Sequence, residues 1–255
     1  MTECNSISLQ LTKVIADVKT ENMTNKGILI AFFIITLWGS NLTLLLSLDT
    51  AKIQLPLIVL AIIWQTFLYT GLFITAHDAM HCLVVAKNPQ VNDWIGKISV
   101  ILYALFSYKN LVEKHSLHHQ YPGTETDPDF DHNQNQNVFI WYFKFMMSYW
   151  DWRQIVGLTL TFHLSHHVLH ISYMNLILFW VTPSILSSIQ LFYFGTFLPH
   201  KRREGGYTNL HCTQSTPLPV FWSFITCYHF GYHKEHHEYP QIPWWRLPDV
   251  YNNNY

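Results

Sequence analysis

The chain has 255 residues, of which only 12% are charged, about half the usual share, while aromatic residues reach 16%. This composition indicates a membrane protein, and a formal net charge of −1 gives no reason to expect nucleic acid as a partner. Histidine is unusually common, because its 16 residues equal all Asp and Glu together.

The first 26 residues are polar and lack the short basic-then-apolar form of a cleavable signal. Uncharged stretches follow at about 27–48 and 53–76. Each is long enough to cross ~30 Å of hydrocarbon at ~1.5 Å per residue, so together they predict a helical hairpin in the membrane. The apolar stretch 98–108 is too short to span and is interpreted as re-entrant or interfacial.

The second half of the chain predicts a similar pair of spans. Residues 139–152 are dense in Trp and Tyr, which favours a helix lying in the membrane interface. No Asp, Glu, Lys or Arg occurs from 154 to 199, and we divide this region into spans at about 155–171 and 175–198. We therefore expect one all-α membrane domain over residues 1–255, with about four transmembrane helices, interfacial helices and a histidine-rich cap.

The distribution of basic residues predicts the orientation of these spans. Fourteen of the fifteen Lys and Arg precede the first span, lie between the second and third, or follow the fourth, and only Lys52 falls on the other side. The positive-inside rule then places both termini and the histidine-rich segments on the cytoplasmic side.

Three histidine motifs lie on that predicted face: H-D-A-M-H at 77–81, H-S-L-H-H at 115–119 and H-K-E-H-H at 233–237. On a helix, residues i, i+3 and i+4 project from one face, so each motif can present its rings together. The candidate ligands are His77, His81, His115, His118, His119, His233, His236 and His237. Eight imidazoles exceed the three or four protein ligands of one zinc, which favours two metal ions. Imidazole suits Zn, Cu, Fe and Ni, so the ligand type alone does not select the metal.

A fourth stretch, H-L-S-H-H at 163–167, has the same spacing but begins inside the third predicted span, roughly 13 Å below the surface. We therefore expect it to stay outside the cluster. His163, His166, His167 and His170 are predicted to form a polar stripe that faces the bundle interior and bonds neighbouring helices. A tunnel lining, a second metal site or a different span boundary are the alternatives.

Several carboxylates occur near the motifs and could orient ligand imidazoles through the second ring nitrogen. They are Asp78, Glu125, Asp127, Asp129, Glu235 and Glu238. The alternative for each is a solvated charge on a loop.

The three motifs resemble the histidine boxes of the membrane di-iron desaturase and hydroxylase superfamily. Four longer stretches, at 64–81, 118–130, 190–201 and 221–248, resemble the bacterial β-carotene ketolases more narrowly; they include W-Q-T-F-L-Y-T-G-L-F-I-T-A-H-D-A-M-H and Q-L-F-Y-F-G-T-F-L-P-H-K. The likeness extends from about residue 28 to 250.

This resemblance implies two iron ions, O2 as co-substrate and a product with keto groups at C4 of β-ionone rings. It also implies one further histidine ligand between the second and third boxes. His200, in F-L-P-H, is the matching candidate, while His229 and His211 are rivals; His229 could instead support the site.

The resemblance also implies external partners. The sequence has no nucleotide-binding glycine motif and no iron–sulfur cysteine set, so we expect electrons from a ferredoxin-type donor. Lys201, Arg202, Arg203 and Lys114 could receive an acidic donor or could simply set the topology. The apolar substrate, β-carotene, should enter from the lipid, and residues 139–152, 221–232 and Trp244–Trp245 could line its path or anchor the interface.

Other functions remain open at this point. The nearest are a fatty-acyl desaturase or hydroxylase and a carotenoid ring hydroxylase. H-D-A-M-H also resembles the H-E-x-x-H of zinc proteases, with Asp78 in the place of the general base. A metal carrier or a bis-histidine haem protein would not be an enzyme.

Overall fold

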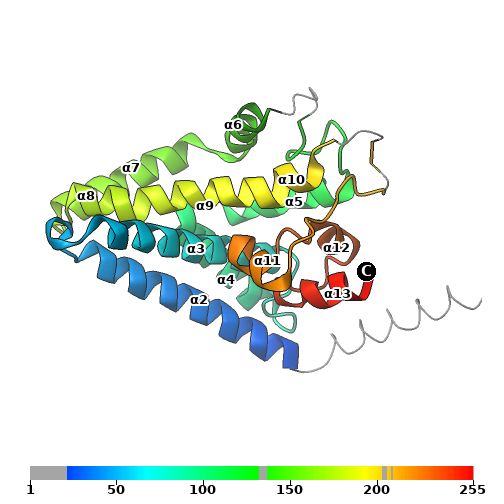
Figure 1. Cartoon of the computed structure of the whole chain (residues 1–255), viewed down its shortest axis with the longest axis horizontal. Helices are drawn as coiled ribbons and strands as arrows, with labels where there is room; N and C mark the ends of the chain where they lie inside the picture. Colours follow the sequence, from blue (N-terminus) through cyan, green and yellow to red (C-terminus); the bar gives the residue numbers. More distant parts are fainter. Residues whose placement is uncertain (1–21, 132–136, 203–205, 208, 255) are drawn as a thin grey trace, which may run out of the picture.

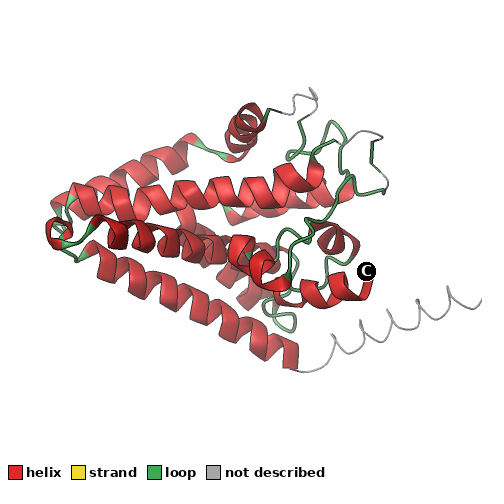
Figure 2. Ribbon diagram, in the orientation of Figure 1, coloured by secondary structure: helices red, strands yellow, loops and turns green. Residues whose placement is uncertain are grey.

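The computed structural model describes residues 22–131, 137–202, 206–207 and 209–254. Residues 1–21 of the polar segment, which was predicted over 1–26, lie outside these residues. So does the candidate docking residue Arg203. Within the described residues every regular element is a helix, which confirms the predicted all-α class (Figure 2).

Three long helices run side by side along the long axis of the molecule (Figure 1). They are α2 (Asn22–Leu46), α3 (Leu55–Met80) and a continuous helix, Tyr173–His200, made of α8 (Tyr173–Asn175), η2 (Leu176–Val181), α9 (Thr182–Phe192), η3 (Tyr193–Phe197) and α10 (Leu198–His200). All three are long and apolar enough to cross a membrane. They correspond to the spans predicted at about 27–48, 53–76 and 175–198. The segments η2 and η3 are wider, π-helical turns within the last helix.

The stretch predicted to be re-entrant contains a sharp bend between α4 (Pro89–Ala104) and α5 (Tyr108–Gln120), whose axes differ by 102°. Pro89 starts α4, where its missing N–H is not needed, and Asn88 accepts a hydrogen bond from the amide of Val91 at 3.1 Å. Leu105 ends α4 with a left-handed φ of 56°. The histidines of α5 meet those at the end of α3, so the pair enters the bundle and returns to the end where it began.

The span predicted at about 155–171 is shorter in the structure. Helix α7 (Trp152–His167) has 16 residues, fewer than the ~20 that a membrane crossing needs. The chain nevertheless passes here from α5, at the histidine end, to α8, at the opposite end (Figure 1). Helix α7 makes most of this passage, and α6 (Val138–Tyr149), which precedes it, lies across the long axis (Figure 1).

The histidines of α7 do not form the predicted inward stripe. His163, His167 and His170 are exposed, and only His166 is half-buried, with its Nδ1 donating to the carbonyl of Ile171 at 2.8 Å. The prediction was wrong because α7 covers the outside of the bundle, so that most of its surface has no neighbouring helix. Among the described residues, no group suited to a metal ion includes these four.

One side chain, Asn175, closes the end of the bundle opposite the histidines. It is buried, and its Nδ2 donates to the carbonyls of Leu46 at 3.0 Å and Leu48 at 2.7 Å, while its Oδ1 accepts from Thr50 at 3.3 Å. The last carbonyls of a helix have no hydrogen-bond donor within the helix. At the end of α2 the side-chain amide of Asn175 is the donor to the carbonyl of Leu46. The connection includes the short helix η1 (Thr50–Lys52).

The C-terminal elements gather at the histidine end (Figure 1). They are α11 (Val220–Cys227), α12 (His233–Glu238), η4 (Trp244–Arg246) and α13 (Leu247–Asn254). A small buried cluster of Tyr232, Ile242, Leu247 and Val250 joins α12 to α13. Together with the ends of α3, α5 and α10, these elements form the predicted histidine-rich cap.

Replacing Asn175 by Asp should destabilise the protein. The substitution keeps the shape of the side chain but turns a donor into a carboxylate that faces two carbonyl oxygens. An unpaired buried polar group costs about 1–3 kcal/mol, so thermal unfolding of the purified protein in detergent should occur several degrees lower. Ser47→Ala, an exposed position of the same connection, is the control; an equal loss in both variants would contradict this role for Asn175.

Candidate metal centre

Four helix ends bring nine histidines together. Helix α3 ends with His77 and His81, α5 carries His115, His118 and His119, α10 ends at His200, and α12 carries His233, His236 and His237. The i, i+3 and i+4 spacings place the rings of each helix on one face. All nine rings make close contacts with at least one ring from another helix.

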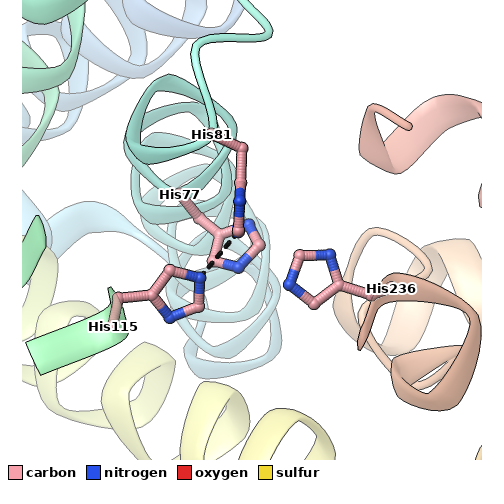
Figure 3. Close-up of side chains that lie close together, drawn as sticks. All are labelled: His77, His81, His115 and His236. Atoms are coloured by element: carbon pink, nitrogen blue, oxygen red, sulfur yellow. Dashed lines mark hydrogen bonds between the residues drawn. The ribbon is translucent and has the colours of Figure 1, made fainter. Parts of the chain in front are cut away.

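The first group contains His77, His81, His115 and His236, whose rings point toward one another from α3, α5 and α12 (Figure 3). Each offers one ring nitrogen, and these four atoms lie within 4.8 Å of one another. The shortest separation, 2.7 Å, joins the Nε2 atoms of His81 and His115.

The second group contains His118, His200, His233 and His237, all buried, with ligand atoms again within 4.8 Å of one another. The Nε2 of His237 lies 3.0 Å from that of His118 and 3.1 Å from that of His233. His119 connects the groups, because its Nε2 lies 3.0 Å from the Nε2 of His236 and its ring stacks on His237 with centroids 4.2 Å apart.

Unsatisfied ring nitrogens support the fit of the groups to metal ions. Both ring nitrogens of His77 and the Nε2 of His200 are buried without a hydrogen-bond partner, an unusual state for buried polar atoms. Two imidazole nitrogens on one metal, each ~2.1 Å from it, are at most ~4.2 Å apart, so small side-chain rotations would bring either group onto an ion. Two groups of four imidazoles therefore suit two ions.

The charge state of the rings supports the same conclusion. Burial, followed by repulsion from the neighbouring histidines, lowers the pKa values of His233, His236 and His237 well below the usual range. These rings are therefore neutral at physiological pH, and neutral imidazole is the form that binds metal.

Two hydrogen bonds fix the orientation of ligand rings in the second group. Asp127 bonds the Nδ1 of His118 at 2.9 Å and also accepts from the amides of Gly123 and Asp129, both at 2.9 Å. Burial alone would raise the pKa of Asp127, but these donors hold it below its usual value. The Nδ1 of His200 donates to the carbonyl of Cys212 at 2.9 Å. In both rings Nε2 is then left to face the cluster.

The other candidate carboxylates differ in their contacts. Asp129 lies 3.9 Å from the Nδ1 of His118 and accepts a hydrogen bond from the hydroxyl of Tyr149. Asp78 lies 3.7 Å from the Nδ1 of His77 and accepts from the amide of Trp244 at 3.2 Å.

Glu235 and Glu238 bond elsewhere: Glu235 accepts from Ser215, and Glu238 lies 3.8 Å from Lys234. Of the three candidates for the ninth ligand, only His200 belongs to a group. His229 packs against Phe224, Tyr232 and Trp244, and the ring of His211 lies 5.8 Å from His237.

An apolar cavity of about 70 Å3 opens onto both groups. Its wall includes His77 and His115 from the first group and His118 and His233 from the second. Phe230 belongs to residues 221–232, which were predicted to line the substrate path or anchor the interface, and it lines this cavity. It packs on His77 at 4.8 Å and on His233 at 5.1 Å between ring centroids. Gly195 leaves room for the Phe230 ring, because a Cβ on residue 195 would lie 2.2 Å from it.

The chain is similar in sequence to one protein family and to several named proteins. The fatty acid desaturase family model matches residues 53–164 and 147–254. A β-carotene ketolase of Paracoccus sp. (strain PC1) is 41% identical over 230 residues, which cover 89% of this chain and 92% of the relative. A β-carotene ketolase of Paracoccus sp. (strain N81106 / MBIC 01143) is 42% identical over 72% of this chain and 75% of its own length. A β-carotene 4-ketolase of Protosiphon botryoides is 37% identical over 76% of this chain and 51% of its own length.

Removing the Asp127 carboxylate should weaken metal binding. Asp127→Ala frees the His118 ring to rotate, and loss of such a partner lowers metal affinity by about 10–100-fold. Titration of the purified protein with a competing chelator measures this. Glu125→Gln, an exposed change in the same loop, should leave the affinity unchanged; equal affinities in all three proteins would refute the role of Asp127.

His200 and His229 should respond differently to substitution. His200→Ala removes one of the four rings of the second group, so the metal content of the purified protein should fall from two ions toward one. His229→Ala should retain both ions, because that ring contacts aromatic side chains and not the groups. Elemental analysis measures both, and the reverse pattern would make His229 the ligand.

Proposed function

The chain belongs to the fatty acid desaturase family and, within it, groups with the β-carotene ketolases; on this basis we propose that it oxidises C4 of β-ionone rings to a ketone. The substrate is β-carotene, the intermediate product is echinenone, and the final product is canthaxanthin. The protein is accordingly a membrane oxidoreductase.

The single observation that supports this function best is the shared wall of the cavity beside the histidines. Two rings of each group open onto one apolar space, so a substrate carbon there can lie next to both groups at once. Aromatic and aliphatic side chains form most of the wall, including Phe73, Phe106 and Leu191. The site therefore suits a hydrocarbon ring with no charged substituent.

Iron suits the proposed chemistry. His77, His81, His115 and His236 would hold one ion, and His118, His200, His233 and His237 the other, with His119 between them. Iron at these positions would supply the redox chemistry with O2 that hydroxylation of an allylic C–H bond requires and that zinc lacks. In each round, O2, two electrons and two protons convert C–H to C–OH and release one water. Two rounds at C4 give a geminal diol, which loses water to form the ketone.

The side chains around the histidines would position the substrate and exclude water. Phe230, fixed by its contact with Gly195, covers His77 and His233 on the cavity side. Asp129 and Tyr149 also line the cavity and are bonded to each other, so neither presents an unsatisfied polar atom to a hydrocarbon. Removal of water protects the site from unproductive oxidation.

The two electrons per round would come from an external, ferredoxin-type donor that docks on the cytoplasmic face. The positive-inside distribution of Lys and Arg supports that orientation of the histidine end and of both termini. Lys114 is a poor docking residue, because it donates to the carbonyl of Ser148 and lies over the Tyr149 ring. Lys201 and Arg202, just after α10, remain candidates, with Arg202 exposed.

The other functions considered have less support. A zinc protease would use Asp78 as general base, but Asp78 is 3% exposed and accepts the amide of Trp244. A carrier or a haem protein does not require two groups of four rings beside one apolar cavity. A fatty-acyl desaturase or hydroxylase and a carotenoid ring hydroxylase share the chemistry, and the names of the relatives favour the ketolase.

Expression in a host that makes β-carotene tests the function. Wild-type protein should yield echinenone and canthaxanthin, identified by pigment analysis, only when oxygen is supplied. His118→Ala should abolish both ketones, because His118 is a buried member of the second group. His163→Ala, an exposed histidine of α7, should leave the yield unchanged. Hydroxylated or desaturated products without ketones would refute the ketolase assignment.

A further inference from the structure

Two more cavities lie next to the one beside the histidines. The second has a volume of about 230 Å3 and the third about 270 Å3. Tyr103, Phe106, Met146 and Ser188 line both the first and the second cavity. Ala104, Leu158 and Trp180 line both the second and the third. The three cavities therefore adjoin in series.

The series runs along the bundle, away from the histidines. The third cavity is lined by Leu42 and Leu46 at the end of α2 and by Leu176 at the start of η2. These residues lie at the end closed by Asn175, which bonds the carbonyl of Leu46. A ligand that filled all three cavities would extend from the metal centre toward the opposite side of the membrane.

The cavities lie between an inner layer of the bundle and an outer layer made by α6 and α7. Helices α4 and α9 supply the inner wall of the first two cavities, through Tyr103, Ser188 and their neighbours. Helices α6 and α7 supply the outer wall, through Met146, Leu158 and Ser165 in turn. Two hydrogen bonds connect these layers: Tyr142 to Ser188 at 2.7 Å, and Gln154 to the carbonyl of Ala104 at 2.6 Å.

The chemistry of the lining identifies the occupant. No Asp, Glu, Lys, Arg or His lines the second or third cavity among the described residues. A molecule with a charged head group would have no ion partner inside these two cavities. Three apolar cavities side by side therefore suit one long molecule that is apolar at both ends.

We propose that the three cavities form one binding groove for the whole carotene, with the reacting ring beside the histidines, the polyene chain in the second cavity and the distal ring in the third, beneath α7. This inference rests on the proposed function, because it takes the carotene as substrate. Leu158 and Ser165 of α7 then contact the part of the substrate that does not react.

Blocking the third cavity should weaken carotene binding without disturbing the metal centre. Leu158→Trp fills the boundary between the second and third cavities, and Ser165→Trp fills the third alone. The holoprotein is prepared in detergent without electron donor, so that β-carotene binds but is not converted. Absorbance of the carotene retained per chain should fall roughly tenfold in both variants, as expected for a loss of about 1–3 kcal/mol by overpacking. Metal content should stay at the wild-type level.

Leu160→Trp is the matched control, because Leu160 lies on α7 with 58% of its surface exposed and should retain wild-type binding. Normal carotene retention in either blocked variant with full metal content would overturn the groove. If Leu158→Trp loses metal, Ser165→Trp alone decides. Wild-type protein that binds carotene in a Leu158-dependent way but makes no ketone would refute the proposed function and leave the groove standing. Ketone formation by both blocked variants at the wild-type rate, with unchanged retention, would refute the groove alone.

Discussion

Convergence of imidazole rings from four helix ends is the constraint on which the rest of the structure depends. Each ring is useful to a metal only when its ligand nitrogen lies within a few ångströms of nitrogens from other helices, and both groups meet this condition within 4.8 Å. The helices that carry these rings lie as far apart in the chain as His81 and His233, which differ by 152 in residue number (233 − 81), so the topology has to return each of them to one end of the bundle. Burial supports this arrangement by keeping the α12 rings uncharged.

This constraint explains the irregular middle of the chain. A straight crossing by α4 and α5 would take His115 to the wrong side of the membrane, and the bend of 102° prevents this. Helix α7 then brings the chain to the opposite end, from which the helix Tyr173–His200 returns to place His200 in the second group. The short helices α6 and α7 also form the outer wall of the proposed groove.

The sequence predicted the long helices and the cluster because both depend on local patterns. Hydropathy identifies a span without knowledge of its neighbours, and histidine spacing identifies a shared helix face. The position of His163 inside its predicted span also correctly predicted that it lies outside the metal groups. The orientation of the His163 stripe was not predictable, because a helix that covers a bundle and one inside it are equally apolar in a membrane. Likewise, Asp127 could not be separated from Glu235 by sequence, since only the fold decides which carboxylate reaches an imidazole. Cavities are spaces between helices and leave no pattern in any one of them.

The π-helical turn η3, Tyr193–Phe197, lies directly before Leu198, Pro199 and His200. In an α-helix each residue advances the side-chain direction by about 100° around the axis, and a π turn accommodates one additional residue without displacing the turns on either side. The azimuth of His200 relative to the lipid-facing part of the same helix is therefore set by this one extra residue. Relatives that differ by a single-residue gap here would preserve the length of the span yet aim their histidine at a different neighbour, so an evolutionary change of ligand could arise from a deletion and need no substitution.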